Sequence, residues 1–259
     1  HALIDTVPSA SAEDIDAALT IAQEGAKIWG AKTADERAKL INAAADALMA
    51  NQKKIAALLS TETGKPIAQS MGCVDLASQL FRGYAEQAKY VYGHVLPGTD
   101  DLIMTNYEPL GVVACINPFN FPVELFGHKA GPALAAGNAV VMKPASDTPL
   151  SSILMAEIMI EAGIPGEVLQ VGTGSGSTVG RALADSPKVN GNSLTGSTAV
   201  GIDIIEHAAK NMTRTVMELG GNDGVLILDD ADLDHAVDEA IGGRIYNAGQ
   251  VCCAPKRYI

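Results

Sequence analysis

Between residues 111 and 218, segments that are expected to form strands alternate with amphipathic stretches, and this alternation limits the possible folds more than any other feature. The expected strands lie at 111–116, 139–142, 168–171, 193–194 and 213–218. The stretches between them, at 123–136, 150–162, 177–184 and 199–210, have the apolar spacing of helices. Strands that alternate with helices form βαβ units and a parallel sheet. The pattern predicts an α/β fold, a Rossmann-like open parallel sheet with flanking helices.

The first third of the chain predicts helices instead. Ser11-Ala-Glu13-Asp14 opens one apolar-periodic stretch, and Thr33-Ala-Asp-Glu36 has the pattern of a capping box before a second one. A further helix is expected over 53–63, until Gly64-Lys-Pro66 interrupts it, and another over 74–92.

The period changes again after residue 95. The runs at 102–107 and 111–116 are rich in residues that favour strands, and Glu108-Pro109-Leu110 separates them. Two strands joined by a turn are expected here.

Composition excludes several function classes. The 259-residue chain carries a net charge of −12, which argues against a nucleic acid or an anionic membrane as partner. Its apolar runs are far too short to span a bilayer. The four cysteines show neither a disulfide framework nor metal-site spacing, so a reducing cytoplasmic location and no bound metal are expected. A phosphate-bearing ligand stays possible, because backbone N–H groups bind phosphate without net positive charge.

Candidate ligand contacts follow the predicted strands, at the edge where open α/β sheets bind ligands. They are Lys143, the glycine-rich turn at 172–180 and the turn Gly196-Ser-Thr198. Each has a simpler interpretation: a solvated surface lysine, glycines that allow tight packing, and a serine N-cap.

Three other residues are candidates for catalysis. Cys252 lies between a Gly-Gln turn and two cations, surroundings that favour the reactive thiolate. Asn120 stands between two aromatic residues and two prolines, where a rigid amide could donate to an oxyanion. Glu218 is a lone carboxylate at the end of an apolar strand, a position that suits a general base. The competing interpretations are a buried cysteine, a structural asparagine and an exposed strand-end glutamate. Cys73, Cys115 and Cys253 are expected to be ordinary buried cysteines.

Taken in order, these motifs resemble the aldehyde dehydrogenase superfamily along essentially the whole chain. The matching segments are Asn117-Pro-Phe-Asn-Phe-Pro122, Gly131-Pro-Ala-Leu-Ala-Ala-Gly-Asn138, Lys143-Pro-Ala145, Thr148-Pro149, Leu194-Thr-Gly-Ser-Thr198, Glu218-Leu-Gly-Gly221, Asp229-Asp-Ala-Asp-Leu-Asp234 and Asn247-Ala-Gly-Gln-Val-Cys252.

The resemblance implies that an aldehyde is oxidised to a carboxylic acid with NAD or NADP. Cys252 would form a thiohemiacetal and then a thioester, Asn120 would bind the oxyanion, and Glu218 would activate the hydrolytic water. It implies cofactor contacts at Ile116, Pro118, Phe119, Lys143, Ser146, Gly176, Gly196, Ser197 and Leu219. NAD-preferring members commonly carry glutamate where this chain has Ser146, so NADP is mildly favoured.

The substrate is less well defined. Segments such as Ala85-Glu-Gln-Ala-Lys-Tyr-Val-Tyr-Gly93 look like the succinate-semialdehyde dehydrogenase branch. That branch typically has an arginine where this chain has Tyr246, and tyrosine cannot bind a carboxylate as a bidentate guanidinium does. A small-molecule aldehyde is expected, and a semialdehyde stays open.

The resemblance also implies a domain organisation. Residues 1–218 are expected to form the cofactor-binding domain, with a hairpin oligomerisation arm at about 95–112. Residues 219–259 would begin a second α/β catalytic domain that continues in relatives, so the chain is expected to be truncated. The parent would be a homodimer or homotetramer. The alternative is a dinucleotide-binding module without catalysis of its own.

Overall fold

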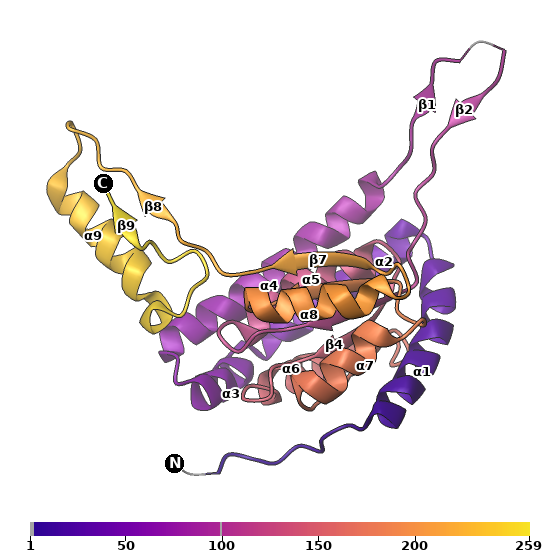
Figure 1. Ribbon diagram of the computed structural model, residues 1–259, viewed down its shortest axis with the longest axis horizontal. Helices are drawn as coiled ribbons and strands as arrows, with labels where there is room; N and C mark the ends of the chain where they lie inside the picture. Colours follow the sequence, from indigo (N-terminus) through magenta and orange to yellow (C-terminus); the bar gives the residue numbers. More distant parts are fainter. Residues whose placement is uncertain (1–2, 99) are drawn as a thin grey trace.

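A five-stranded parallel sheet forms the centre of the computed structural model, which describes residues 3–98 and 100–259 (Figure 1). The strands lie in the order β5-β4-β3-β6-β7. They are β3 (Val112–Ile116), β4 (Ala139–Lys143), β5 (Leu169–Val171), β6 (Gly191–Thr195) and β7 (Arg214–Glu218). All four pairings are parallel. The predicted α/β class with a parallel sheet is confirmed.

Helical segments connect successive strands of this sheet. They are α5 (Pro122–Ala135), α6 (Leu150–Glu161), a π-helical turn η2 (Gly176–Gly180) followed by α7 (Arg181–Asp185), and α8 (Thr198–Ala209). The chain reverses strand order after β5, since β6 pairs with β3 on the side opposite β4. Open α/β sheets bind ligands at such a reversal, beyond the carboxyl ends of the strands.

Four helices precede the sheet: α1 (Ala12–Gly30), α2 (Ala34–Ala50), α3 (Gln52–Thr63) and α4 (Ile67–Gln87), which continues into a 3₁₀ turn η1 (Ala88–Tyr90). The predicted capping box of Thr33 with Glu36 is present, and Ser11 and Asp14 form a second one at the start of α1. The expected interruption at Gly64-Lys-Pro66 is confirmed, since α3 ends at Thr63 and α4 begins at Ile67. The expected start of the fourth helix at residue 74 is wrong, because α4 begins directly after Pro66. Proline suits a helix start, where its missing N–H would have no partner.

Side-chain alternation along the strands divides the core into two clusters. Val113, Cys115, Val140 and Met142 pack with α2–α6 on one face, and Val112, Ala114, Ala139 and Val141 pack with α1, α7 and α8 on the other. Both faces are covered at β3 and β4, and every residue of these two strands is buried.

A two-stranded hairpin projects from this body (Figure 1). β1 (Val95–Leu96) pairs antiparallel with β2 (Ile103–Met104). The expectation that the run at 102–107 pairs with the run at 111–116 across Glu108-Pro109-Leu110 is wrong. β3 is a central strand with β4 and β6 as its neighbours, so no free edge is left for β2.

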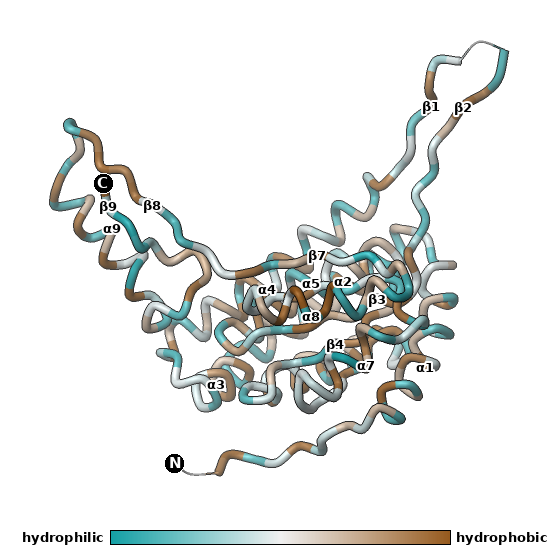
Figure 2. The backbone as a smooth tube through the Cα atoms, in the orientation of Figure 1, coloured by the Kyte–Doolittle hydropathy of each residue, from teal (hydrophilic) through white to brown (hydrophobic). Residues whose placement is uncertain are grey.

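Residues 219–259 leave the sheet and form a small unit of β8 (Gly224–Val225), α9 (Leu233–Ile245), a 3₁₀ segment η3 (Tyr246–Gly249) and β9 (Arg257–Tyr258). β8 and β9 pair in parallel, and none of the residues of α9 is buried. Figure 2 shows apolar residues along the exposed chain that follows β8, where Leu226 and Leu228 lie. Across the described residues, no helix has the length and apolarity needed to cross a membrane.

Candidate active site

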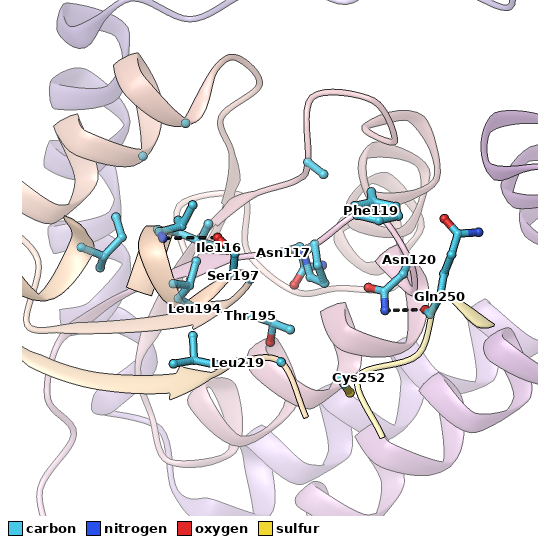
Figure 3. A pocket seen from close by; sticks show the side chains of 18 of the residues that line it. Ile116, Asn117, Phe119, Asn120, Leu194, Thr195, Ser197, Leu219, Gln250 and Cys252 are labelled. Atoms are coloured by element: carbon cyan, nitrogen blue, oxygen red, sulfur yellow. Dashed lines mark hydrogen bonds between the residues drawn. The ribbon is translucent and has the colours of Figure 1, made fainter. Parts of the chain in front are cut away.

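A cleft of about 660 Å³ lies at the carboxyl ends of the sheet strands and joins them to the segment around Cys252 (Figure 3). β3, β4 and β6, the turn at η2, the start of α8 and the loop after β7 contribute to its wall. The opposite wall is Arg244, residues 249–252 and Lys256. Segments that lie more than a hundred residues apart in sequence therefore form a single cavity.

Cys252 lines this cleft and is exposed. The interpretation of Cys252 as a buried cysteine is therefore wrong. The Glu218-Leu-Gly-Gly221 turn approaches it closely, because a Cβ added at Gly221 would lie 2.6 Å from the carbonyl oxygen of Cys252. Only glycine allows that approach without displacement of one of the two segments.

Cys253 is also exposed, which contradicts its expected burial, whereas Cys73 and Cys115 are buried as predicted. Partial desolvation and the neighbouring Cys252 thiol raise the pKa of Cys253. The Cys253 thiol is therefore a weaker nucleophile at neutral pH than an unperturbed thiol would be.

Asn120 lines the same cleft, and its side chain reaches the segment that carries Cys252. Its Nδ2 donates to the carbonyl oxygen of Gln250 at 2.9 Å, a contact drawn in Figure 3. An amide nitrogen carries two hydrogens, so this bond leaves one N–H for another acceptor. Asn120 and Cys252 thus line the same cleft, and the Asn120 amide is bonded to the segment that carries Cys252.

The backbone before Cys252 adopts an unusual conformation. Asn247 (φ 50°) and Ala248 (φ 55°) both lie in the left-handed region, followed by Gly249 (φ 75°). Left-handed conformations cost free energy in residues other than glycine and persist only where contacts hold them. Two hydrogen bonds tie Asn247 to distant segments: its N–H donates to Gln69 Oε1 and its Nδ2 donates to the carbonyl oxygen of Asn120.

Eight of the nine residues expected to contact a cofactor line the cleft: Ile116, Pro118, Phe119, Lys143, Gly176, Gly196, Ser197 and Leu219. Ser146 is not among the lining residues, and its Oγ donates to the carbonyl oxygen of Gly174 at 3.1 Å. Ser146 is exposed beside the glycine-rich turn, so it lies near that wall without forming it.

The structure decides whether Lys143 is a solvated surface lysine and whether Ser197 is a helix N-cap. Lys143 is only 4% exposed, so the interpretation as a solvated surface lysine is wrong. Burial lowers the pKa of Lys143, and its Nζ donates to the carbonyl oxygen of Pro144 at 2.9 Å. Ser197 does cap α8, since its Oγ accepts the N–H of Val200. The remaining N–H groups of the first turn of α8 have no partner within the helix.

Glu218 is exposed at the end of β7 and does not line the cleft itself. Met217 and Leu219 pack toward the cluster of α1, α7 and α8, so strand alternation turns Glu218 to the opposite face. That face carries Lys129 of α5. Burial lowers the pKa of Lys129, and the charges of Cys115 and Glu218 only partly oppose this shift. The Lys129 ammonium donates to Ser193 Oγ at 3.2 Å.

Sequence reasoning did not single out Lys129, Asn117 or Thr195. Lys129 could have been recognised in the sequence, because it interrupts the apolar face of α5 formed by Phe126, Ala130 and Ala133. Asn117 and Thr195 line the cleft with buried side-chain oxygens, Oδ1 and Oγ1, that have no hydrogen-bond partner among the described residues. Nothing in the sequence marks those two atoms, since their isolation arises only where β3 and β6 end together.

Along its whole length, the chain is similar to proteins of a single enzyme family. The model of the aldehyde dehydrogenase family matches residues 1–259. The NADP+ succinate-semialdehyde dehydrogenase GabD of Escherichia coli (strain K12) is 40% identical over 259 residues, which cover 99% of this chain and 54% of GabD. The 3-sulfolactaldehyde dehydrogenase of Pseudomonas putida is 40% identical over 256 residues, 98% of this chain and 53% of that protein.

Solved structures agree with this. PnpE in complex with nicotinamide adenine dinucleotide superimposes with a TM-score of 0.97 at 38% identity, covering 99% of this chain and 53% of that one. PnpE comes from Pseudomonas sp. WBC-3. The chain spans about half the length of the relatives that it matches.

Proposed function

The chain belongs to the aldehyde dehydrogenase family, and from that premise we propose that the protein carrying it oxidises an aldehyde to a carboxylic acid with NAD or NADP as the hydride acceptor. The observation that carries the proposal is the cleft, in which Cys252 and Asn120 stand opposite the strand ends and the helix start of α8. A nucleophile, an amide donor and a cavity large enough for a cofactor open onto the same space.

The residues of the cleft fit a dinucleotide. The first turn of α8 offers backbone N–H groups to a diphosphate, which suits a protein of net charge −12 because no cationic patch is needed. The buried oxygens of Asn117 and Thr195 are unpaired acceptors in the wall, and the amide and hydroxyl groups of a cofactor could satisfy them. When bound, the nicotinamide supplies a hydride acceptor.

In the proposed reaction, the thiolate of Cys252 attacks the aldehyde carbon, and the oxygen of the resulting adduct becomes an oxyanion. The free N–H of the Asn120 amide and the backbone N–H of Cys252 stabilise that charge. Loss of hydride from the adduct leaves a thioester on Cys252. Attack by water then releases the acid and restores the thiol.

Glu218 is the proposed base for that water. The turn at Gly220 and Gly221 connects Glu218 to the backbone contact with Cys252, so the proposed base lies three residues before that contact. Lys129 is buried on the same face of the sheet as Glu218, and the negative charge of Glu218 acts to raise the pKa of the Lys129 ammonium, against the larger effect of burial.

We propose an aldehyde substrate with a short polar chain. The relatives are a succinate-semialdehyde and a 3-sulfolactaldehyde dehydrogenase, named for aldehydes that carry an acidic group. In this chain Tyr246 stacks on Phe121, with ring centroids 6.2 Å apart and planes 6° from parallel. The pair is a flat apolar surface and offers no guanidinium, so an acidic group would need a cation from elsewhere.

We further propose that residues 1–218 form the cofactor-binding unit and that residues 219–259 begin the catalytic unit. The change in burial supports this boundary, because α9 has no buried residue whereas the sheet strands β3 and β4 are fully buried. The projecting β1–β2 hairpin, with Val95 and Met104 exposed, is proposed as the arm that contacts a second subunit.

The decisive experiment measures aldehyde-dependent formation of reduced cofactor by the protein expressed from its complete gene. Cys252→Ser should lower kcat by at least about a thousandfold and leave cofactor binding unchanged, because the hydroxyl is a far weaker nucleophile. Cys253→Ser is the matched control, one residue away, and should retain most of the activity. Cofactor binding without any aldehyde turnover in the wild-type protein would instead support a dinucleotide-binding module.

A further inference from the structure

Lys65 is a buried cation that none of the proposed chemical steps uses. It lies between α3 and α4 and is only 2% exposed. Its ammonium donates to the carbonyl oxygen of Asn120 at 3.0 Å, lies 3.4 Å from the sulfur of Cys73, and stands 3.6 Å from the centroid of the Phe121 ring. Burial of an ammonium is costly unless such partners replace its water.

The turn that carries Lys65 is built to direct it inward. Gly64 ends α3 in the left-handed conformation (φ 75°), and Pro66 fixes the entry into α4. Ser60 Oγ donates to the carbonyl oxygen of Lys65 at 2.6 Å. With both sides of the turn fixed, the long side chain is aimed into the space behind Asn120.

The partner that matters is the Asn120 peptide. Its carbonyl oxygen accepts two hydrogen bonds, from Lys65 Nζ and from Asn247 Nδ2, each at 3.0 Å. Its side-chain amide donates to Gln250. One residue thus connects the buried ammonium to both ends of the strained segment 247–250 that leads to Cys252.

We propose that Lys65 is a positioning residue for the reaction: its charge anchors the Asn120 peptide and, through it, the segment that presents Cys252. This inference rests on the proposed function only for its kinetic consequence. The anchoring itself is a property of the fold and can be measured without turnover. Charge-assisted hydrogen bonds are stronger than neutral ones, which is why an ammonium suits this role.

The test compares Lys65→Met with Lys54→Met, an exposed lysine on α3 that receives the same substitution. In the protein expressed from its complete gene, Lys65→Met should lower kcat about tenfold to a hundredfold, since misplacement of a catalytic group by about 1 Å costs that much. The KM for the cofactor should change by less than about twofold. Lys65→Arg keeps the charge and should recover part of the loss.

Hydrogen–deuterium exchange of the segments 118–121 and 247–253 is the readout that does not depend on activity. Both should exchange faster in Lys65→Met and at the wild-type rate in Lys54→Met. If Lys65→Met fails to fold, Lys65→Gln, which keeps a donor without the charge, takes its place with the same expectations. Wild-type kcat and exchange in the folded variant would overturn the inference. Absence of turnover in the wild-type protein would refute the proposed function alone, and exchange would still decide the role of Lys65.

Discussion

At the scale of single residues, the four cysteines show how position in the fold separates identical side chains. Cys252, which lines the cleft, and its neighbour Cys253 are exposed, whereas Cys73 contacts a buried lysine and Cys115 is buried in β3. Burial raises the pKa of Cys115 to about 12, opposed only by the charge of Lys129. Sequence reasoning distinguished Cys252 by its motif, but it could not separate Cys253 from the two buried cysteines.

This difference predicts the order of thiol labelling. At about pH 8, iodoacetamide should modify Cys252 and Cys253 in the native protein, and Cys73 and Cys115 only after unfolding in urea, because the thiolate is the reactive form. Peptide mass mapping over time measures the order. Labelling of native Cys115 as fast as Cys252 would contradict the burial of β3. In a Cys252→Ser variant, Cys253 should be the cysteine that is labelled in the native protein, and Cys73 and Cys115 should again be labelled only after unfolding.

The raised pKa of Cys115 makes the stability of the fold depend on pH. The folded pKa of Cys115, about 12, lies above the value of about 8.5 for an unfolded thiol. Its contribution to stability is therefore complete below about pH 8.5 and is lost as the pH rises toward 12.

At the scale of elements, α1 and α4 differ in how closely their glycines approach other segments. Gly25 of α1 is buried, and a Cβ there would collide with the backbone carbonyl of Glu167. Gly83 of α4 is exposed, and a Cβ added there would meet no atom within 4 Å. The two glycines look alike in sequence, since each lies inside a helix.

Alanine at these two positions should have opposite effects. Gly25→Ala should lower the free energy of unfolding by about 1–3 kcal/mol, because α1 must move away from the loop before β5. Gly83→Ala should raise it by about 0.5–1 kcal/mol, because alanine loses less backbone entropy in a helix. Urea unfolding of both variants beside the wild type measures the pair. Equal changes of the same sign would refute the close packing of α1.

Some of the helices and strands can be predicted from local sequence patterns alone. The capping boxes at Ser11 and Thr33 and the alternation after residue 111 are local signals, and the structure contains each of them. Strand pairing is not local. The run at 102–107 has the residues of a strand, but only the occupied edges of β3 decide that it pairs with β1 instead.

At the scale of the whole molecule, the cleft exists only because the segment 244–256 folds back over the strand ends. A ligand that bridges both walls binds the folded state and not the unfolded chain, so it must stabilise the fold. The start of α8 and the buried Lys143 line this cleft, and we propose that they bind the phosphate groups of the cofactor despite the acidic net charge of the chain.

We therefore expect NADP to raise the melting temperature of the chain. At about a hundred times its Kd, a ligand stabilises a fold by about 2.7 kcal/mol, which corresponds to about 5–10 °C for a domain of this size. NAD at the same concentration should give a smaller rise, since Ser146 leaves the glycine-rich turn without the carboxylate that would repel a 2′-phosphate. Differential scanning fluorimetry measures both. Lys143→Ala should reduce the rise and Lys54→Met should not, and a larger shift with NAD would reverse the predicted preference.

The sequence alone determined the fold class, the two capped helices and the residues Cys252, Asn120 and Lys143 as candidates, because their motifs are short and act through neighbours in the chain. Only the tertiary structure decided that Lys143 is buried, that Ser146 stands outside the cleft wall, and that Lys65 and Lys129 are buried cations behind the site. The physical reason is that burial and charge pairing depend on which distant segments meet. No local pattern records that the turn before α4 and the segment before Cys252 share the carbonyl oxygen of Asn120.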